Sequence, residues 1–257
     1  MSDSQTSRAF GIDIGGTGIK GAPVDLEAGD FAAERVRIPT PQPATPEAIG
    51  DVVVELLGEF EGDDAAPGAP IGITVPGVVS HGVVRSAANI DESWLGTDAD
   101  ALFSNLTGRR VHAVNDADAA GLAEARYGAA RGRGGLVIVT TLGTGIGSAL
   151  LLDGVLVPNT ELGHLEVEGH HAETWAANSA RERKDLSMEE WAERLTVYYG
   201  TLERLFSPEL IVVGGGISKR SDEFLPLIDI GTTIVPARLR NRAGVVGAAV
   251  YASERAG

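Results

Sequence analysis

Three glycine-rich segments carry the residue types that bind phosphate. The first is DIGGTGIK at 13–20, which follows a short apolar run near the start of the chain. The second, TLGTGIGS at 141–148, repeats that pattern, and a third loop at 214–216 also follows an apolar run. Loops of this kind present backbone N–H groups that bind oxyanions. Glycine is equally typical of a structural β-hairpin turn, but three such loops in one chain favour a phosphate site.

The candidate phosphate ligands in these segments are backbone N–H groups, two hydroxyls and two ammonium groups. They belong to Gly15, Gly16, Thr17, Gly18, Lys20, Gly143, Thr144, Gly145, Gly214, Gly215, Gly216 and Lys219. The chain has three lysines, and two of them adjoin these loops. For Lys20 two interpretations stay open, because it could contact phosphate or brace the second strand of the hairpin.

A candidate general base lies in NDADAAGLAEA, where an apolar run meets a helical pattern. Asp116 or Asp118 could serve there as the N-cap of the helix. Alternatively, Asp116 lies at the carboxyl end of a strand, where open α/β sheets bind ligands. A carboxylate in that place can accept the proton of a substrate hydroxyl.

A third polar segment, ELGHLEVEGHHAE, combines carboxylates with imidazoles. Glu161, His164 and Glu173 have the hydrogen-bonding groups to hold a polyol. Alternate positions along a strand point to one face, so a metal site is a second interpretation and an exposed polar hairpin is a third. The metal site would use His164, Glu166, Glu168, His170 and His171.

The elements that must position these groups alternate between strands and helices, which predicts an α/β fold with partly parallel sheets. The repeated glycine hairpin predicts two related lobes that face each other across a cleft. Apolar runs predict strands over 9–14, 18–24, 31–38, 71–75, 111–114, 136–141 and 210–213. Helical patterns and caps predict helices over 46–60 after Thr45, 116–127, 187–206 with a capping box from Ser187 to Glu190, and 244–254.

Composition narrows the functional classes. The chain has 257 residues, 43% of them hydrophobic, which is enough for one large or two modest domains. It has no apolar run long enough to span a membrane, no signal-peptide pattern and no cysteine. Disulfides and thiolate zinc sites are therefore excluded, and a cytoplasmic location is expected. A net charge of −15 disfavours nucleic acid as a partner.

Basic residues are nevertheless concentrated in two stretches without acids, 125–152 and 236–250. Chance clustering on solvated faces and a local anion site are both consistent with this pattern. The basic residues concerned, with the two that lie between the stretches in sequence, are Arg126, Arg131, Arg133, Arg238, Arg240, Arg242, Lys219 and Arg220.

Taken together and in this order, DIGGTGIK, VPGVV, NDADAAGLAEA, TLGTGIGS, ELGH and VVGGGISK resemble the ROK family of sugar kinases. The motifs span residues 11–219. The resemblance implies an actin-like (ribonuclease H-like) two-domain fold with an interdomain cleft. It implies a smaller N-terminal domain over 1–114, joined by the C-terminal helix 243–257, and a larger domain over 115–242.

The resemblance also implies roles for individual residues. The three glycine loops would form the phosphate and nucleotide end of the donor site. Asp116 matches the catalytic base that deprotonates the sugar hydroxyl, and Asp13 would lie near the donor phosphates and near Mg²⁺, through water. The positions that match sugar contacts are Asn89, Asn115, Asp116, Glu161, His164 and Glu173.

One departure from the family pattern narrows the expected activity. Most members have a cysteine-rich zinc loop after E-x-G-H, whereas EGHHAETWAANSARER here has no cysteine. No zinc is therefore expected, and His164 would contact the sugar directly. This segment and the C-terminal 50 residues resemble the polyphosphate/ATP glucokinase branch. That branch implies phosphorylation of glucose at the 6-hydroxyl, with inorganic polyphosphate or ATP as donor and Mg²⁺ as cofactor.

Other interpretations stay open. The chain could be an ATP-only glucokinase or a kinase for another hexose, such as mannose or fructose. A sugar-responsive repressor of the same family would need an N-terminal helix-turn-helix, and only about eight residues precede the first predicted strand. A non-catalytic sugar sensor would not need Asp116. Family members are often dimers, so a homodimer is expected, with the 187–206 helix as a candidate interface.

Overall fold

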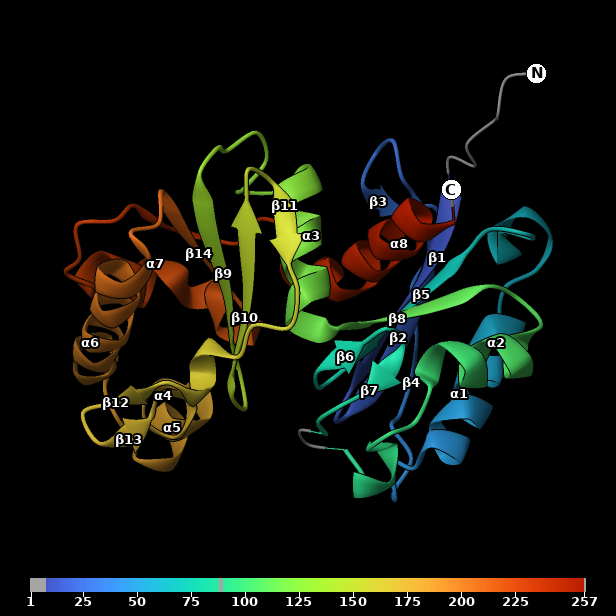
Figure 1. Ribbon diagram of the computed structural model, residues 1–257, viewed down its shortest axis with the longest axis horizontal. Coiled ribbons are helices and arrows are strands. Elements are labelled where there is room, and N and C mark those ends of the chain that lie inside the picture. The colour runs from blue at the N-terminus through green and yellow to red at the C-terminus, as the bar shows by residue number, and fades with distance from the viewer. Residues whose placement is uncertain (1–7, 88–89, 257) are drawn as a thin grey trace. The chain divides into compact units, whose positions relative to one another are not determined.

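The computed structural model describes residues 8–87 and 90–256 (Figure 1). The chain divides into two compact units. Unit 1 comprises Met1–Ala119 and Arg242–Gly257, and unit 2 comprises Ala120–Asn241. The boundary falls inside helix α3 (Asp116–Tyr127), so the first turn of that helix belongs to unit 1.

Unit 1 is built on a six-stranded sheet with the order β3-β2-β1-β5-β8, in which β4 also pairs with β2. β1 and β2 form an antiparallel hairpin, whereas β1, β5 and β8 run parallel. A separate small hairpin is formed by β6 (Val79–Ser80) and β7 (Val83–Val84). The strands of the sheet are β1 (Arg8–Gly15), β2 (Gly18–Asp25), β3 (Asp30–Phe31), β4 (Val36–Ile38), β5 (Ile71–Val75) and β8 (Val111–Asn115).

The single strand predicted over 31–38 is wrong, because the structure has two short strands there, β3 and β4. Both pair with β2, but residues 32–35 stand opposite only Ala22 and Pro23 of that strand. Four residues cannot pair in register with two, and Pro23 has no N–H group to donate to a neighbouring strand. The edge of the sheet is therefore interrupted at Pro23.

The helix over Pro46–Gly58 begins at the cap that the sequence predicts, and a helix that was not predicted, Ala99–Thr107, also begins at a side-chain cap. The Thr45 hydroxyl accepts a hydrogen bond from the Ala48 N–H group, and the Asp98 carboxylate accepts one from Ala101. Gly108 ends the second helix in the left-handed conformation. These helices and the short 3₁₀ turns are α1 (Pro46–Gly58), η1 (Gly62–Ala65), η2 (Glu92–Trp94), α2 (Ala99–Thr107) and α8 (Ala243–Arg255).

Helix α8 packs closely against β1 and β5 of unit 1. Gly11 and Gly72 lie side by side at the same register of these two parallel strands. A side chain at Gly11 would overlap the backbone of Val245, and one at Gly72 would overlap that of Ala248. The pair of glycines therefore lets the backbone of α8 approach the sheet directly, which is the use of glycine at close approaches.

Unit 2 contains a five-stranded sheet with the order β11-β10-β9-β14-β15. It repeats the arrangement of unit 1, since β9 and β10 form an antiparallel hairpin and β9, β14 and β15 run parallel. This shared topology agrees with the repeat of the two glycine hairpins in the sequence. The strands are β9 (Leu136–Leu142), β10 (Ile146–Leu152), β11 (Val155–Val157), β14 (Leu210–Gly214) and β15 (Ile234–Pro236), with β12 (Glu166–Val167) and β13 (His170–His171) as a separate hairpin.

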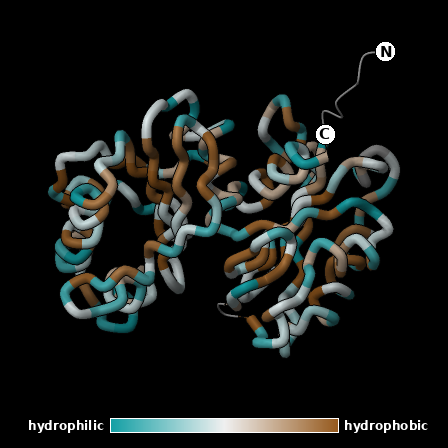
Figure 2. Tube along the Cα trace, viewed as in Figure 1, coloured by the Kyte–Doolittle hydropathy of each residue, from teal (hydrophilic) through white to brown (hydrophobic). Residues whose placement is uncertain are grey.

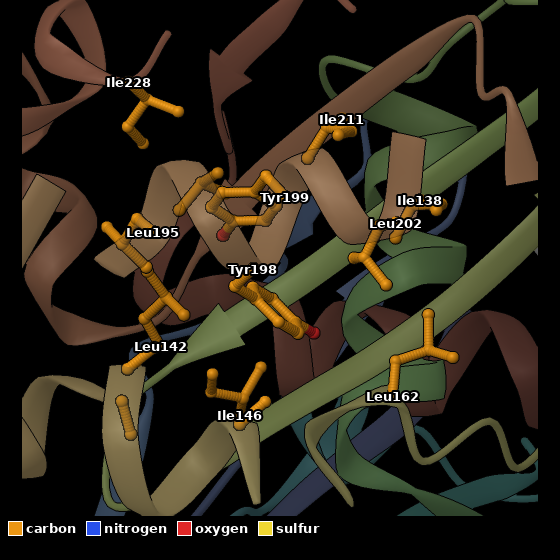
Figure 3. Packing of buried hydrophobic residues seen from close by; sticks show 14 of the residues in the cluster. Ile138, Leu142, Ile146, Leu162, Leu195, Tyr198, Tyr199, Leu202, Ile211 and Ile228 are labelled. Carbon is orange, nitrogen blue, oxygen red and sulfur yellow. The ribbon is translucent and has the colours of Figure 1, made fainter. Parts of the chain in front are cut away.

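The core of unit 2 is completed by α6 (Met188–Phe206), which opens with the predicted capping box between Ser187 and Glu190. Its buried face includes Tyr198 and Tyr199, which lie among apolar side chains of the sheet (Figure 3). Apolar residues concentrate along the central strands of each unit (Figure 2). The remaining helices and turns are η3 (Leu162–His164), α4 (Ala172–Ala176), α5 (Asn178–Arg183), η4 (Gly216–Arg220), α7 (Ser221–Phe224), η5 (Leu225–Leu227) and η6 (Arg240–Arg242).

The α/β composition and the parallel strands agree with the expected fold class. Within residues 8–87 and 90–256, every helix is too short or too polar to span a lipid bilayer.

Candidate functional site

The first glycine loop is the tip of the β1–β2 hairpin in unit 1, where Gly15 pairs with Gly18. The Arg37 guanidinium donates a hydrogen bond to the Thr17 carbonyl at 2.8 Å, and the Thr40 hydroxyl donates to the Gly15 carbonyl. These bonds hold the turn and occupy two of its carbonyl oxygens. The loop therefore offers a ligand mainly backbone donors and the Thr17 hydroxyl.

Each of the three glycine loops has one glycine that faces open space. A methyl group built on Gly16, Gly143 or Gly216 would meet no described atom within 4 Å. All three residues have φ values outside the left-handed region, so neither packing nor backbone conformation demands glycine there. An anion that approaches the backbone closely is a physical reason for glycine at such positions.

The second and third loops leave the sheet of unit 2 at the same edge. Residues 143–145 follow β9 and residues 214–216 follow β14, and these two strands are parallel neighbours. Ser179 braces the second loop, because its N–H group donates to the Gly143 carbonyl at 3.0 Å and its hydroxyl to the Thr144 carbonyl at 2.6 Å. In the third loop, Gly215 has a φ of 85° and lies against Leu142, so glycine is required there by conformation as well.

The Asp13 carboxylate of unit 1 is held from both neighbouring strands. Asp13 stands at the register of Lys20 on β2 and of Thr74 on β5. The Lys20 ammonium lies 3.1 Å from Oδ2, and the Thr74 hydroxyl donates to Oδ1 at 3.0 Å. Thr74 is fully buried and also accepts the Ile14 N–H group at 3.1 Å. Lys20 thus contacts a carboxylate across the hairpin, which agrees with the bracing interpretation.

Gly244 leaves room beside this carboxylate. A Cβ atom at Gly244 would lie 2.8 Å from the Asp13 Cγ and 2.9 Å from Oδ1. A side chain at this first turn of α8 would therefore press on the carboxylate. Asp13 is oriented by two donors and left accessible by a glycine.

Helix α3 is capped by Asn115, which corrects the interpretation of Asp116 or Asp118 as its N-cap. The Asn115 Oδ1 accepts the N–H groups of Ala117 at 2.8 Å and Asp118 at 3.0 Å, while its Nδ2 donates to the Gly77 carbonyl at 3.0 Å. Asn115 is buried. Asp116, the exposed first residue of α3, follows the carboxyl end of β8 and its Oδ1 accepts the Ala117 N–H at 2.9 Å. Asp116 thus lies at the carboxyl end of a parallel strand, at the position where the sequence predicts a general base.

Glu161, His164 and Glu173 come together in unit 2. The His164 Nε2 lies 3.9 Å from a carboxylate oxygen of Glu161 and 3.9 Å from one of Glu173. An added Cβ at Gly145 would reach the Glu173 carboxylate, so this group borders the second glycine loop. Two carboxylates and an imidazole around one point supply the acceptors and donors that a polyol needs.

Burial raises the pKa of Glu161, with the nearby Glu173 charge adding to this effect and His164 opposing it. The physical cause is the loss of water around the ionised carboxylate. Glu161 consequently keeps its proton to a higher pH than an ordinary surface glutamate does, and it can donate a hydrogen bond only while it is protonated.

The histidine-rich hairpin is exposed at its tip. His170 and His171 lie on β13, and His170 stacks on Trp175 with ring centroids 6.2 Å apart. Among residues 8–87 and 90–256, no three His, Asp or Glu side chains are grouped so that they could hold a metal ion. Glu166, Glu168, His170 and His171 are all exposed, which agrees with the interpretation as an exposed polar hairpin. Asn89, predicted to contact the sugar, lies outside the described residues.

Sequence patterns did not indicate Thr40, Thr74 or Ser179 as parts of the site. Thr74 lies in the strand IGITV, where a threonine is an ordinary β-branched strand residue. Thr40 and Ser179 act through single hydroxyls on loop carbonyls that are distant in sequence. No local pattern identifies such contacts.

Comparison with known proteins gives these features a family. A profile of the ROK family matches residues 9–179. The chain belongs to the ROK family. The polyphosphate glucokinase of Mycobacterium tuberculosis (strain CDC 1551 / Oshkosh) is 50% identical over 242 residues, which cover 94% of this chain and 89% of that protein.

Solved structures of ROK proteins share the fold. An inorganic polyphosphate/ATP-glucomannokinase from Arthrobacter sp. strain KM matches with a TM-score of 0.93 and 57% identity, over 97% of this chain and all of that one. A ROK family glucokinase from Streptomyces griseus, solved with glucose and AMPPNP, matches with a TM-score of 0.80 and 25% identity, over 97% and 100% of the two chains. The ROK sugar kinase fold, of the actin-like class, is thus confirmed.

Proposed function

We propose that this protein transfers a phosphoryl group to the 6-hydroxyl of glucose, with inorganic polyphosphate or ATP as the donor. The observation that carries the proposal is the 50% and 57% identity, over nearly the whole chain, to two proteins named for the use of polyphosphate. The exposed Asp116 and the three open glycine loops are the groups that this chemistry needs.

In the proposed reaction, Asp116 accepts the proton of the sugar hydroxyl as the oxygen attacks the terminal phosphorus. A new bond forms between that oxygen and phosphorus, and the bond from phosphorus to the bridging oxygen of the donor breaks. The donor leaves one phosphate shorter. Backbone N–H groups of the glycine loops stabilise the charge on the transferred group, which is the main requirement of phosphoryl transfer.

Asp13 fits the role of a group that holds Mg²⁺ through water. Mg²⁺ is commonly bound by one or two carboxylates and completes its coordination with waters and phosphate oxygens, so a larger cluster of ligands is not needed. Thr74 and Lys20 fix the carboxylate, and Gly244 leaves space beside it. When bound, Mg²⁺ would neutralise charge on the donor phosphates.

Glu161, His164 and Glu173 are the proposed sugar-binding residues of unit 2, and Asn115 and Asn89 those of unit 1. Asn115 already uses its side-chain oxygen on the amides of α3. Its contribution to the sugar is therefore limited to the second hydrogen of its Nδ2 group, since the first is donated to Gly77.

Substitution of Asp116 tests the proposed mechanism. Asp116→Asn keeps the size of the side chain but removes the base, so turnover is expected to fall by about a thousandfold or more while glucose binding persists. Turnover can be measured as glucose 6-phosphate formation, and binding by calorimetry. Turnover of Asp116→Asn within tenfold of the unsubstituted protein would contradict the role of Asp116.

Mannose is the second acceptor that we propose, because the Arthrobacter relative is named a glucomannokinase. An assay with mannose in place of glucose measures this directly. The homodimer, the cytoplasmic location and a role in glycolysis are predictions that light scattering, fractionation and metabolite measurements would test.

A further inference from the structure

One buried carboxylate ties together two arginine-bearing segments of unit 2. Glu124 on α3 is fully buried. Its Oε2 accepts the Ala129 N–H group at 2.7 Å, and its Oε1 accepts the Leu239 N–H group at 2.8 Å. Burial of a carboxylate is costly unless its oxygens are hydrogen-bonded. This contact therefore fixes the segment 128–135 next to the segment 237–241, although they are far apart in sequence.

The two segments carry four exposed arginines, which we call the arginine strip: Arg131, Arg133, Arg238 and Arg240. Within the described part of the chain, none of the four makes an ion pair or a side-chain hydrogen bond. Two other arginines are neutralised: Arg220, which lies between the acid-poor stretches in sequence, pairs with Glu223 at 2.6 Å, and Arg242 pairs with Asp30.

This concentration of free positive charge contrasts with the rest of the molecule. The chain has 36 acidic and 21 basic residues, so an unpaired arginine has many potential acidic partners. Four unpaired guanidinium groups lie on two adjoining segments without acids and give a local positive charge to an acidic protein, while Asp153 and Glu209 contact the first segment at its end, Gly135. Such a local charge attracts anions.

The topology of unit 2 connects the arginine strip with the donor end of the sheet. β15 runs parallel to β14, so 237–241 leaves the sheet at the same edge as the glycine loop 214–216. The segment 128–135 enters β9 at the opposite end of that strand from the glycine loop 143–145. Because Glu124 joins the two segments, the arginine strip starts at the end of the sheet that carries the glycine loops, which we call the donor edge, and leads away from it.

We propose that the arginine strip binds the phosphates of a long polyphosphate donor that lie beyond the transferred group. This inference rests on the proposed function. Guanidinium groups match phosphate oxygens in geometry and charge. ATP has only three phosphates before its adenosine, so we expect its phosphates not to reach the arginines that lie away from the glycine loops 143–145 and 214–216.

Polyphosphate fits the strip better than a nucleic acid does. Single-stranded nucleic acids are bound through aromatic side chains that stack on bases as well as through cations. The segments 128–135 and 237–241 contain no aromatic residue. A polymer with phosphate groups only has nothing to stack, and a row of arginines suffices for it.

The double variant Arg131→Ala/Arg133→Ala tests the proposal at the end of the strip that lies farthest from the donor edge. The matched control is Lys184→Ala/Arg204→Ala, which removes the same charge from exposed positions elsewhere in unit 2. For each variant, KM and turnover are measured with ATP, with tripolyphosphate and with a long polyphosphate at saturating glucose. Binding of the long polymer and of an oligonucleotide is measured against salt concentration.

We expect the strip variant to raise KM for the long polymer about 3- to 10-fold, as exposed charge contacts of this kind contribute. The salt dependence of polymer binding should weaken with it. KM for ATP and for tripolyphosphate should stay unchanged, and the control should match the unsubstituted protein throughout.

Two results would overturn the proposal: equal KM values for the long polymer in the strip and control variants, or oligonucleotide binding as tight as polymer binding and lost in the same variant. An unsubstituted protein that transfers phosphate from ATP but from no polyphosphate would instead contradict the proposed donor. The failure of the inference is thus distinguishable from the failure of the proposed function.

Discussion

Asp13 illustrates how two neighbouring strands set the orientation of one carboxylate. Thr74 is fully buried and accepts the Ile14 N–H group, so its own hydrogen is directed to the Asp13 Oδ1. Lys20 holds the other oxygen. The sequence indicated Asp13 and Lys20 through their motif, but Thr74 becomes visible only when β1 and β5 are paired in register. Pairing of distant strands is not encoded in any local pattern.

Thr74→Val should impair the donor side of the reaction. Valine has nearly the same shape but no hydroxyl, so Asp13 loses its oriented donor and the Ile14 N–H group loses its acceptor. We expect turnover to fall about tenfold, equivalent to one net hydrogen bond of roughly 1–1.5 kcal/mol, with KM for glucose unchanged. Thr74→Ser should restore turnover. Steady-state kinetics with varied concentrations of Mg²⁺ and donor would measure this effect. Turnover of Thr74→Val equal to that of the unsubstituted protein would refute the role of Thr74.

The raised pKa of Glu161 predicts a pH dependence of sugar binding. Burial makes its carboxylate harder to ionise than an exposed glutamate. As the pH falls, Glu161 therefore gains its proton earlier than an ordinary glutamate, and its oxygens lose acceptor strength. KM for glucose should rise in mildly acidic solution, whereas Glu161→Gln should show a higher KM that varies less in the same range. A parallel pH profile for both proteins would contradict this prediction.

The raised pKa of Glu161 also predicts how the free energy of unfolding depends on pH. The folded state binds the Glu161 proton more tightly than the unfolded chain does. The stabilising contribution of this group is therefore present at low pH and is lost as the pH rises through the raised pKa of the folded state. Thermal unfolding of Glu161→Gln against pH would show the difference from the unsubstituted protein.

At the level of elements, the helices α1, α3, α6 and α8 and the strands β1, β2, β5, β8, β9 and β14 follow from periodicity and caps. The Thr45 and Ser187 caps begin their helices as the sequence predicts, because cap side chains contact only residues of the next turn. The N-cap of α3 was not predicted correctly, because Asn115 rather than an aspartate caps this helix. Asn115 also donates a hydrogen bond to the Gly77 carbonyl. The prediction of one strand over 31–38 was wrong because the interruption opposite Pro23 depends on the pairing of this segment with β2.

Glu124 is the element-scale feature with the largest expected effect on stability. Its substitution by alanine leaves the buried Leu239 N–H group and the half-buried Ala129 N–H group without their acceptor. We expect Glu124→Ala to lower the free energy of unfolding by about 2–4 kcal/mol, since each unsatisfied buried donor costs roughly 1–3 kcal/mol. Glu124→Gln retains one acceptor oxygen, so its free energy of unfolding should lie between those of Glu124→Ala and the unsubstituted protein. Chemical denaturation measures this, and a loss below about 0.5 kcal/mol for Glu124→Ala would rule out the clamp.

At the level of the whole molecule, the order of the motifs predicted the family and the fold, because the glycine loops and the helix that begins at Asp116 recur at fixed points of one topology. Both sheets have the hairpin-then-parallel order that this requires. The donor is less visible in the sequence. Free arginines bind a polymer only where the fold gathers them, and the contact that gathers them here comes from Glu124, an unremarked residue of a helical pattern.

The central claim is that phosphate moves from polyphosphate to glucose without a nucleotide. The direct measurement is ³¹P NMR of purified protein with glucose, Mg²⁺ and a long polyphosphate, and with no ATP or ADP present. We expect the glucose 6-phosphate resonance to appear, and we expect Asp116→Asn to abolish its appearance. Glucose left unphosphorylated under these conditions, or the same rate in Asp116→Asn, would contradict it.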